Sequence, residues 1–306
     1  MRHSPSRKTD LPTLLLALLL SLPGVGLAAP SSFPSMKKGV GDTSGLAASI
    51  DGLKVSWYYN WKPAPDAGNP QAEFVPMIWG DYFATDKVLD AIKANPRYTA
   101  LLAFNEPDGT GESNMTVAQA IALWPKLMAT GKRLGSPAVT QSGPGALWLE
   151  QFMAQANALG YRVDFLCVHW YDDVTQPQAA PMLASFLSDL HDKYHLPIWL
   201  TEFSGGNWDF IAHKPLTYKH NTDFIAKALP LLEGLPFVER YAWFATISDQ
   251  GNFKYFYEKA SLYRSDSDDF TEVGAAYRDF TPEPLFSAAS FKRVPYRIRP
   301  HRPDKR

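Results

Sequence analysis

Two glutamates far apart in the chain each end an apolar run. The segment "LLAFNEPD" (101–108) places Asn105 and Glu106 directly before a proline, and "WLTEF" (199–203) carries Glu202. Burying a carboxylate is costly unless the charge is paired or neutralised, so packing does not explain either residue. Two facing carboxyl groups suit the cleavage of an acetal, in which one protonates the leaving oxygen and the other meets the developing cation.

Eight apolar runs are predicted to form the strands that position these residues. Apolar residues follow one another in these runs rather than alternating with polar ones, which is typical of parallel strands covered on both faces. The runs are 37–41, 53–61, 73–79, 98–105, 134–139, 163–170, 197–203 and 239–245.

Amphipathic segments between several of these runs predict helices. Residues 182–194 carry apolar side chains on one helical face, and further helices are expected at 86–95, with Asp86 as its N-cap, and at 116–127 and 224–232. The alternation predicts an α/β fold, a closed (β/α)8 TIM barrel forming a single catalytic domain over 37–280. The alternative, an open doubly wound sheet, usually carries a phosphate loop, and the glycines at 39–45 are misspaced for one.

In a barrel of this kind, active residues lie at the carboxyl ends of the strands. Glu106, His169, Tyr171, Glu202 and Trp243 are all expected there. Three more aromatic residues are candidates for stacking on a ligand: Trp57 and Tyr59, which share one strand face, and Trp208 in the polar loop "SGGNWDF".

The two ends of the chain differ in composition from the middle. Residues 1–29 begin with basic residues, continue with an apolar run and end in small residues, which predicts a signal peptide and a secreted protein, extracellular or periplasmic. Residues 30–36 are expected to be a linker. Residues 281–306 form a basic, Pro-rich tail that we expect to be loosely held and solvated.

Charge and cysteine content narrow the possible partners. A formal net charge of -1 argues against nucleic acid, and no membrane association is expected after signal cleavage. The single cysteine, Cys167, excludes an internal disulfide and is expected to be a small buried residue. His191 and His195 have helical spacing but no glutamate between them, so we expect no metal site. We also expect the protein to need no cofactor and to be a monomer.

Seven ordered segments carry a resemblance to a known family. The segments are "SWYYNW" (56–61), "FVPMIW" (74–79), "FNEPD" (104–108), "GSPAVT" (135–140), "DFLCVHWYD" (164–172), "WLTEFS" (199–204) and "RYAWFA" (240–245). Together they resemble glycoside hydrolase family 128 of clan A, from about residue 37 to 280. The resemblance implies a β-1,3-glucanase with a retaining mechanism.

The resemblance also implies a role for each motif residue. Glu106 would be the general acid/base and Glu202 the nucleophile. Asn105 would donate to the sugar 2-hydroxyl, His169 and Tyr171 would orient the nucleophile, and Trp243 would form the platform beneath the sugar. Two alternatives stay open: a clan A hydrolase for another β-linked polysaccharide, and a non-catalytic glucan-binding protein. The motifs do not choose between endo and exo action.

Overall fold

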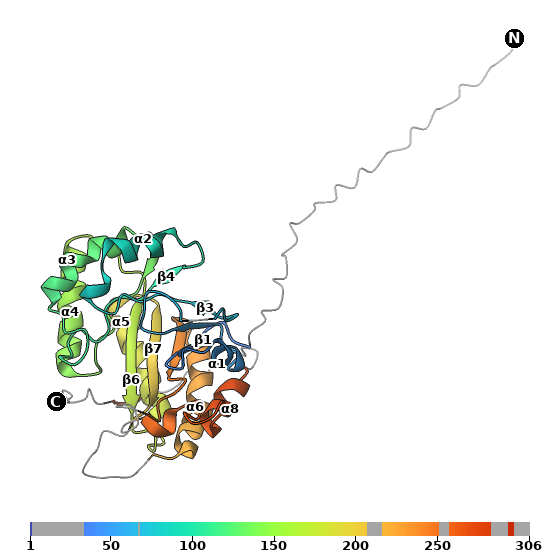
Figure 1. The fold of residues 1–306 in the computed structure, drawn as a ribbon. Helices are drawn as coiled ribbons and strands as arrows, with labels where there is room; N and C mark the ends of the chain where they lie inside the picture. Colours follow the sequence, from blue (N-terminus) through green and yellow to red (C-terminus); the bar gives the residue numbers. More distant parts are fainter. Residues whose placement is uncertain (2–33, 67, 207–215, 251–256, 283–292, 297–306) are drawn as a thin grey trace. The chain divides into compact units, whose positions relative to one another are not determined.

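The computed structural model describes Met1 and residues 34–66, 68–206, 216–250, 257–282 and 293–296. The chain divides into two units, Met1–Ser32 and Phe33–Arg306, and the second contains the strands and helices named here. Its strands are all parallel to their neighbours and alternate with helices (Figure 1). They are β1 (Lys38–Gly41), β2 (Trp57–Tyr59), β3 (Glu73–Phe74), β4 (Ala100–Leu101), β5 (Arg133–Leu134), β6 (Leu166–Asp172), β7 (Ile198–Gly205) and β8 (Val238–Phe244).

The eight strands close into a ring. Six form one sheet in the order β3-β2-β1-β8-β7-β6, and β4 pairs with β5. Parallel bridges join the two sheets on both sides, between Met77 and Leu102 and between Gly135 and Phe165. The expected (β/α)8 barrel is therefore confirmed, and the open sheet is excluded. All eight predicted runs carry a strand, although β2 to β5 are shorter than predicted.

The helices cover the outside of the barrel. All four predicted helices form: α2 (Asp86–Ala94), α3 (Val117–Met128), α5 (Ala179–Tyr194) and α6 (Tyr218–Gly234). The N-cap of α2 is Thr85 rather than Asp86, because the Thr85 side chain accepts the Val88 N–H. Within the described residues, three helices were not predicted: α1 (Ala47–Gly52), α4 (Gly143–Ala158) and α8 (Glu272–Asp279). None of the described helices is long and apolar enough to cross a membrane.

Side chains fill the barrel interior. Trp57, Phe165 and Trp199 are almost fully buried, and the Phe165 and Trp199 rings stack with centroids 4.1 Å apart. Cys167 belongs to the same cluster, as expected for a small buried residue. Arg240 lies over the Trp199 ring at 4.4 Å and pairs with Glu73 at 2.5 Å. This packing closes the interior toward the amino ends of the strands.

Two consecutive lysines hold helix ends at that amino end. The Lys37 ammonium donates to the carbonyls of Leu232, Glu233 and Leu235, where α6 terminates. The Lys38 ammonium donates to the carbonyls of Tyr277, Arg278 and Phe280, where α8 terminates. Helix C-termini present unpaired carbonyls and a partial negative charge, so both lysines satisfy them.

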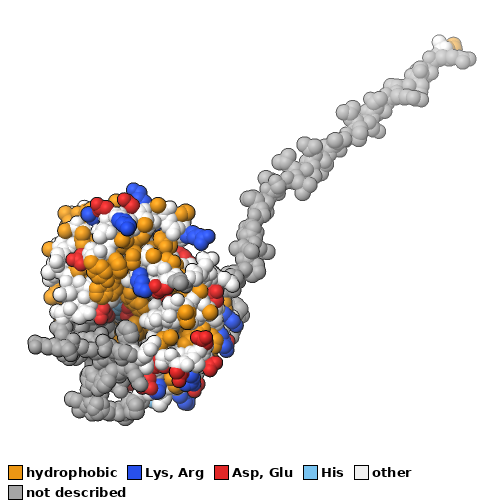
Figure 2. All heavy atoms as spheres, in the orientation of Figure 1, with side chains coloured by type: hydrophobic (Ala, Val, Ile, Leu, Met, Phe, Trp, Pro, Cys, Tyr) orange, Lys and Arg blue, Asp and Glu red, His pale blue; other side chains and the backbone are white. Residues whose placement is uncertain are grey.

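Part of the tail contacts the barrel. Arg293 pairs with Asp189 and Asp192 of α5 at 2.8 and 2.6 Å, and Tyr296 packs edge-on against Phe186. The tail was expected to be loosely held, and residues 293–296 depart from that expectation because α5 offers them two carboxylates and an aromatic ring. On the face shown in Figure 2, acidic and basic side chains are interspersed.

Candidate active site

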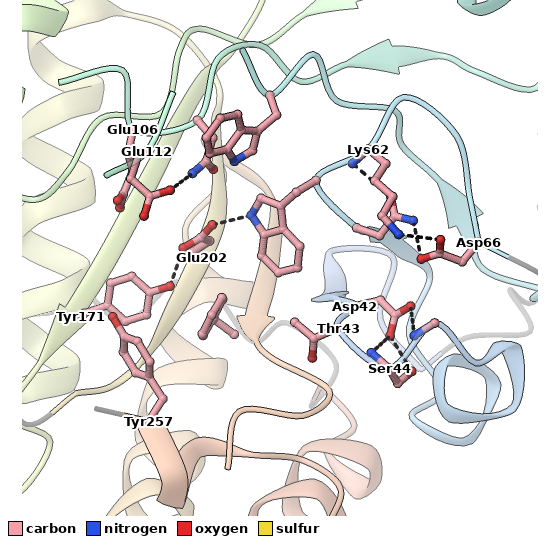
Figure 3. Close-up of a pocket in the computed structure, with 16 residues that line it drawn as sticks. Asp42, Thr43, Ser44, Lys62, Asp66, Glu106, Glu112, Tyr171, Glu202 and Tyr257 are labelled. Carbon is pink, nitrogen blue, oxygen red and sulfur yellow. Dashed lines mark hydrogen bonds and ion pairs between the residues drawn. The ribbon is translucent and has the colours of Figure 1, made fainter. Parts of the chain in front are cut away.

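A cleft of about 890 Å³ opens where the strands end. Its walls come from the segments that follow β1, β2, β3 and β4 and from the ends of β6, β7 and β8 (Figure 3). The lining residues are Asp42, Thr43, Ser44, Gly45, Asn60, Trp61, Lys62, Asp66, Trp79, Asn105, Glu106, Glu112, Tyr171, Glu202, Phe244 and Tyr257. Both glutamates singled out from the sequence face this cleft.

Glu202 lies on β7 and receives several hydrogen bonds. Trp61 Nε1 donates to Glu202 Oε1 at 2.8 Å, and the Tyr59 hydroxyl lies 3.4 Å from the same oxygen. The Tyr171 hydroxyl donates to Glu202 Oε2. The three donors converge on the Glu202 carboxylate, which points into the cleft.

Glu106 follows β4 in a sharply turned segment. Its φ is 39°, in the left-handed region, and its N–H donates to the Ala138 carbonyl at 2.6 Å. Pro107 cannot continue a strand ladder, and Asp108 accepts the Thr140 N–H at 2.9 Å, which ties the loop to the segment between β5 and α4. The turn directs the Glu106 side chain to His169, whose Nδ1 lies 3.0 Å from Glu106 Oε1.

His169, on β6, lies between the side chains of Glu106 and Glu202. Its Nε2 is 3.5 Å from Glu202 Oε1, and one ligand atom of each of the three residues lies within 4.8 Å of the others. Burial lowers the pKa of His169, but the charge of Glu202, the hydrogen bond to Glu106 and the charge of Glu106 outweigh it and raise the pKa above its usual value. The three side chains could also hold a metal ion, but His169 would have to be neutral to ligate it.

Asn105 and Tyr171 complete the surroundings of the carboxylates. Asn105 Nδ2 donates to Glu112 Oε2 at 3.3 Å, so the amide nitrogen is turned toward the cleft. Burial and the neighbouring charge of Glu202 raise the pKa of Tyr171 well above its usual value, so its hydroxyl remains a donor. The structure therefore brings Asn105, Glu106, His169, Tyr171 and Glu202 together, as the sequence predicted.

Trp243 does not face the cleft, and this prediction is corrected. Its side chain is 0% exposed, its Nε1 donates to the Ala260 carbonyl at 2.7 Å, and it packs against Phe203 and Tyr277 in the helix layer. Side chains alternate along a strand, so the preceding Ala242 faces the interior and Trp243 faces outward. The next residue, Phe244, lines the cleft instead.

The prediction that Trp57 and Tyr59 contact a ligand is also wrong. Both face inward as predicted, but both are 0% exposed and neither lines the cleft. Trp57 fills the barrel interior beside Trp199, with centroids 5.4 Å apart. Tyr59 lies one level higher and donates to the Thr201 carbonyl at 2.9 Å, so it supports Glu202 from below. Trp208 lies outside the described residues.

Trp61 and Trp79 also line the cleft, although neither was predicted to contact a ligand. Trp61 follows Trp57 and Tyr59 with the same alternation, and it is the member nearest the carboxyl end of the strand. The rule that ligand contacts lie at strand carboxyl ends would have selected it over the other two. A cluster of three polar residues that line the cleft was also not predicted. In it, the Asp66 carboxylate accepts hydrogen bonds from Asn60 and Lys62 (Figure 3).

Known proteins share this fold and sequence. The family model "Glycosyl hydrolase catalytic core" matches residues 37–277. Alkali-sensitive linkage protein 1 of Schizosaccharomyces pombe is 30% identical over 205 residues, which are 64% of this chain and 36% of that protein. The chain thus spans about a third of that relative's length.

Solved structures extend the comparison. A GH128 subgroup I endo-β-1,3-glucanase from Amycolatopsis mediterranei, in complex with laminaritriose, is 39% identical with a TM-score of 0.71, covering 80% of this chain and 99% of that one. A subgroup III curdlan-specific exo-β-1,3-glucanase from Blastomyces gilchristii, in complex with glucose, is 31% identical with a TM-score of 0.63, covering 80% and 98%. The protein therefore belongs to the glycosyl hydrolase catalytic core family and, within it, to the glycoside hydrolases of family GH128.

Proposed function

We propose that this glycoside hydrolase is secreted and cleaves β-1,3-glucan by a retaining double displacement. The observation that carries the mechanism is the approach of the two glutamates across the cleft, with one oxygen of each within 4.8 Å. Carboxyl groups about 5–5.5 Å apart are typical of retaining enzymes, whereas inverting enzymes need about 6.5–9.5 Å to admit a water molecule. The short separation supports retention.

The hydrogen bonds around each carboxylate support the division of roles. Glu202 accepts from Trp61 and Tyr171, which stabilise the anion that a nucleophile must be. Glu106 faces His169 Nδ1 instead, a nitrogen that can accept or donate according to its protonation. We assign proton transfer to Glu106 because His169, a group that can itself exchange a proton, contacts its carboxyl group, whereas fixed donors hold Glu202.

In the first step, a Glu202 oxygen attacks the anomeric carbon while Glu106 gives its proton to the leaving glycosidic oxygen. The carbon–oxygen bond breaks, and a glycosyl ester forms on Glu202. In the second step, Glu106 takes a proton from water, the water oxygen attacks the same carbon, and Glu202 leaves as a carboxylate. Two inversions give net retention, and Glu106 ends the cycle protonated.

The identity of the sugar rests on the relatives and on the cleft walls. The two enzymes described above are β-1,3-glucanases, and one was solved with laminaritriose. Trp61, Trp79, Phe244 and Tyr257 give this cleft aromatic surfaces on which apolar sugar faces can pack. Asn105 Nδ2, held by Glu112, is positioned to donate to a sugar hydroxyl beside Glu106.

Product analysis tests this proposal against its alternatives. We expect the protein to release reducing sugars from laminarin, and the size of the early products separates endo from exo action. Cleavage of xylan, mannan or galactan without cleavage of laminarin would favour a hydrolase for another β-linked polysaccharide. Binding of laminarin with no product, equal in wild type and Glu202→Ala, would show a non-catalytic glucan-binding protein.

Secretion has its own test. The charged start, apolar run and small residues of positions 1–29 support a cleavable signal peptide. Expression of the full chain with its natural leader, followed by N-terminal sequencing of exported protein, should show cleavage near Ala28 or Ala29. Recovery of the uncleaved chain from the cytoplasm alone would contradict the proposal.

A further inference from the structure

One aromatic side chain stands out on the surface beside the cleft. Of the large hydrophobic side chains that are exposed within the described part of the chain, Tyr82 alone is aromatic, and it is 58% exposed. It lies in a short 3-10 helix, η1 (Asp81–Phe83), three residues after the cleft residue Trp79. A single exposed apolar side chain is ordinary on a protein surface, so the contacts of Tyr82 with cleft residues decide whether it has a role.

The position of Trp79 links Tyr82 to the catalytic residues. The Trp79 carbonyl accepts the Asn105 N–H at 2.9 Å, so Trp79 sits beside the strand end that carries Glu106. The Trp79 and Tyr82 ring centroids are 5.8 Å apart, at an interplanar angle of 51°. Aromatic surface therefore continues from the carboxylates through Trp79 to Tyr82, past the limit of the lined cleft.

The Tyr82 ring is held in place although its surface is open. Its centroid lies 4.3 Å from that of Phe83, which packs against the core between α2 and α3. Gly80 lies beneath the ring, because a Cβ at that position would meet Tyr82 Cε1 at 3.4 Å and Ser113 Cβ at 3.3 Å. A ring fixed on these sides and exposed on another loses little conformational freedom when it binds a ligand.

We propose that Tyr82 is an outer sugar-binding platform for a glucan chain that extends from the cleft beyond Trp79. The occupant is an unbranched β-linked glucose chain, whose uncharged rings present C–H faces to an aromatic side chain. No acidic or basic group is needed for this contact, which suits a neutral polysaccharide. The inference rests on the proposed function and adds a binding position to the same cleft.

An outer platform acts only on chains long enough to reach it. Loss of Tyr82 should therefore weaken binding of long substrates and leave the bond-breaking step unchanged. We expect Tyr82→Ala to raise KM for laminarin about three- to tenfold with unchanged kcat. KM and kcat for a short aryl laminaribioside should stay at the wild-type values. Tyr82→Phe keeps the ring and should retain the wild-type KM for laminarin.

Leu159 supplies a matched control for the loss of exposed apolar surface. It is 54% exposed and follows the C-terminal end of α4, the helix end that leads back to the amino side of the barrel. Leu159→Ala should leave KM unchanged for both substrates. Thermal unfolding of each variant checks that the fold is kept.

The outcomes separate this inference from the proposed function. A wild-type protein that cleaves no β-1,3-glucan fails the proposed function itself. A wild type that cleaves laminarin, with Tyr82→Ala showing the same KM, overturns the platform alone. Equal losses on laminarin and on the short substrate would also overturn it, because they would mean that Tyr82 acts by holding Trp79 rather than by touching a distant sugar.

Discussion

At the amino end of the barrel, Lys37 and Lys38 donate to backbone carbonyls at the ends of α6 and α8, whereas at the carboxyl end Glu106, His169 and Glu202 contact one another. The lysine ammonium groups bind backbone carbonyls at helix ends, and these contacts can stay the same throughout a catalytic cycle. The carboxyl-end charges sit within reach of one another, so moving one proton alters all three. Charge buried at one end holds the fold, and charge buried at the other end can do chemistry.

Buried polar atoms without a hydrogen bond occur at both ends. Among the described side chains, Asn105 Oδ1, Gln141 Nε2 and His169 Nε2 are such atoms near the carboxyl end, and Arg240 Nη1 is one at the amino end. His169 Nε2 is 3.5 Å from Glu202 Oε1, a contact that attracts by charge but is too long for a good hydrogen bond. Function and stability are therefore expected to separate between the carboxyl and amino ends of the barrel.

The largest effect is expected for Glu202→Gln. The amide keeps the shape but cannot form the glycosyl ester, so we expect kcat on laminarin to fall by about 10⁴-fold or more. The side-chain volume is unchanged and the protein should stay folded, although the charge that raises the pKa of His169 is lost. Urea unfolding followed by tryptophan fluorescence, run beside the kinetic assay, measures both. A stable variant with near wild-type kcat would end the assignment of Glu202.

A smaller loss is expected for His169→Gln. It removes the group between the two carboxylates, and misplacement of either carboxylate costs up to about 100-fold in kcat. The pKa of His169 is raised, so its contribution to stability is complete below the unfolded pKa near 6.5 and is lost as pH rises through the folded pKa. The stability of the wild type should therefore fall with rising pH by more than that of the variant. Unfolding midpoints of both proteins, measured from pH 6 upward, would reveal this difference.

Lys38→Ala tests the opposite end. Three carbonyls lose their partner, so we expect the free energy of unfolding to fall by about 2–4 kcal/mol while kcat of the folded protein is unchanged. Burial lowers the pKa of Lys38 from 10.5 to about 8. The unfolded chain thus binds more protons between these values, and the contribution of Lys38 to stability rises with pH from about 8 to 10.5. The variant should show a flatter slope there; a changed kcat would contradict the separation of the two ends.

Arg133→Met should have the smallest effect. Arg133 pairs with Glu239 at 2.9 Å near the amino end, but both side chains are partly exposed, and exposed ion pairs contribute about 0–1 kcal/mol. We expect a change in unfolding free energy within that range and no change in KM or kcat. A loss comparable to that of Lys38→Ala would show that the amino end depends on its surface ion pairs.

The same contrast shows what could be predicted from the sequence. The eight strands and the glutamates at their ends followed from local patterns, because each buried parallel strand needs its own apolar run and each burial of charge needs an explanation. Helix α4 was missed, because its start "GPGALW" resembles a loop and its cap Ser142 lies among turn-forming residues. Capping by Ser142 and the proline in the first turn were the available signals.

The aromatic contacts could not be assigned to the correct level or face. Trp57 and Tyr59 share one face of β2, whereas Trp61 lies two residues past the end of the strand and reaches the cleft. Trp243 and Phe244 are neighbours on β8 and face opposite sides, and the packing of β8 against the rest of the barrel decides which of them faces inward. Register depends on contacts between distant segments, which a single sequence does not display.

The most direct test of the central claim is to trap the intermediate of the proposed double displacement. An activated 2-deoxy-2-fluoro laminaribioside should inactivate the enzyme, and peptide mass spectrometry should place one added glycosyl group on Glu202. Hydrolysis followed by NMR should show a first-formed β-anomer. A label on Glu106, or no label together with a first-formed α-anomer, would contradict the roles assigned to the two glutamates.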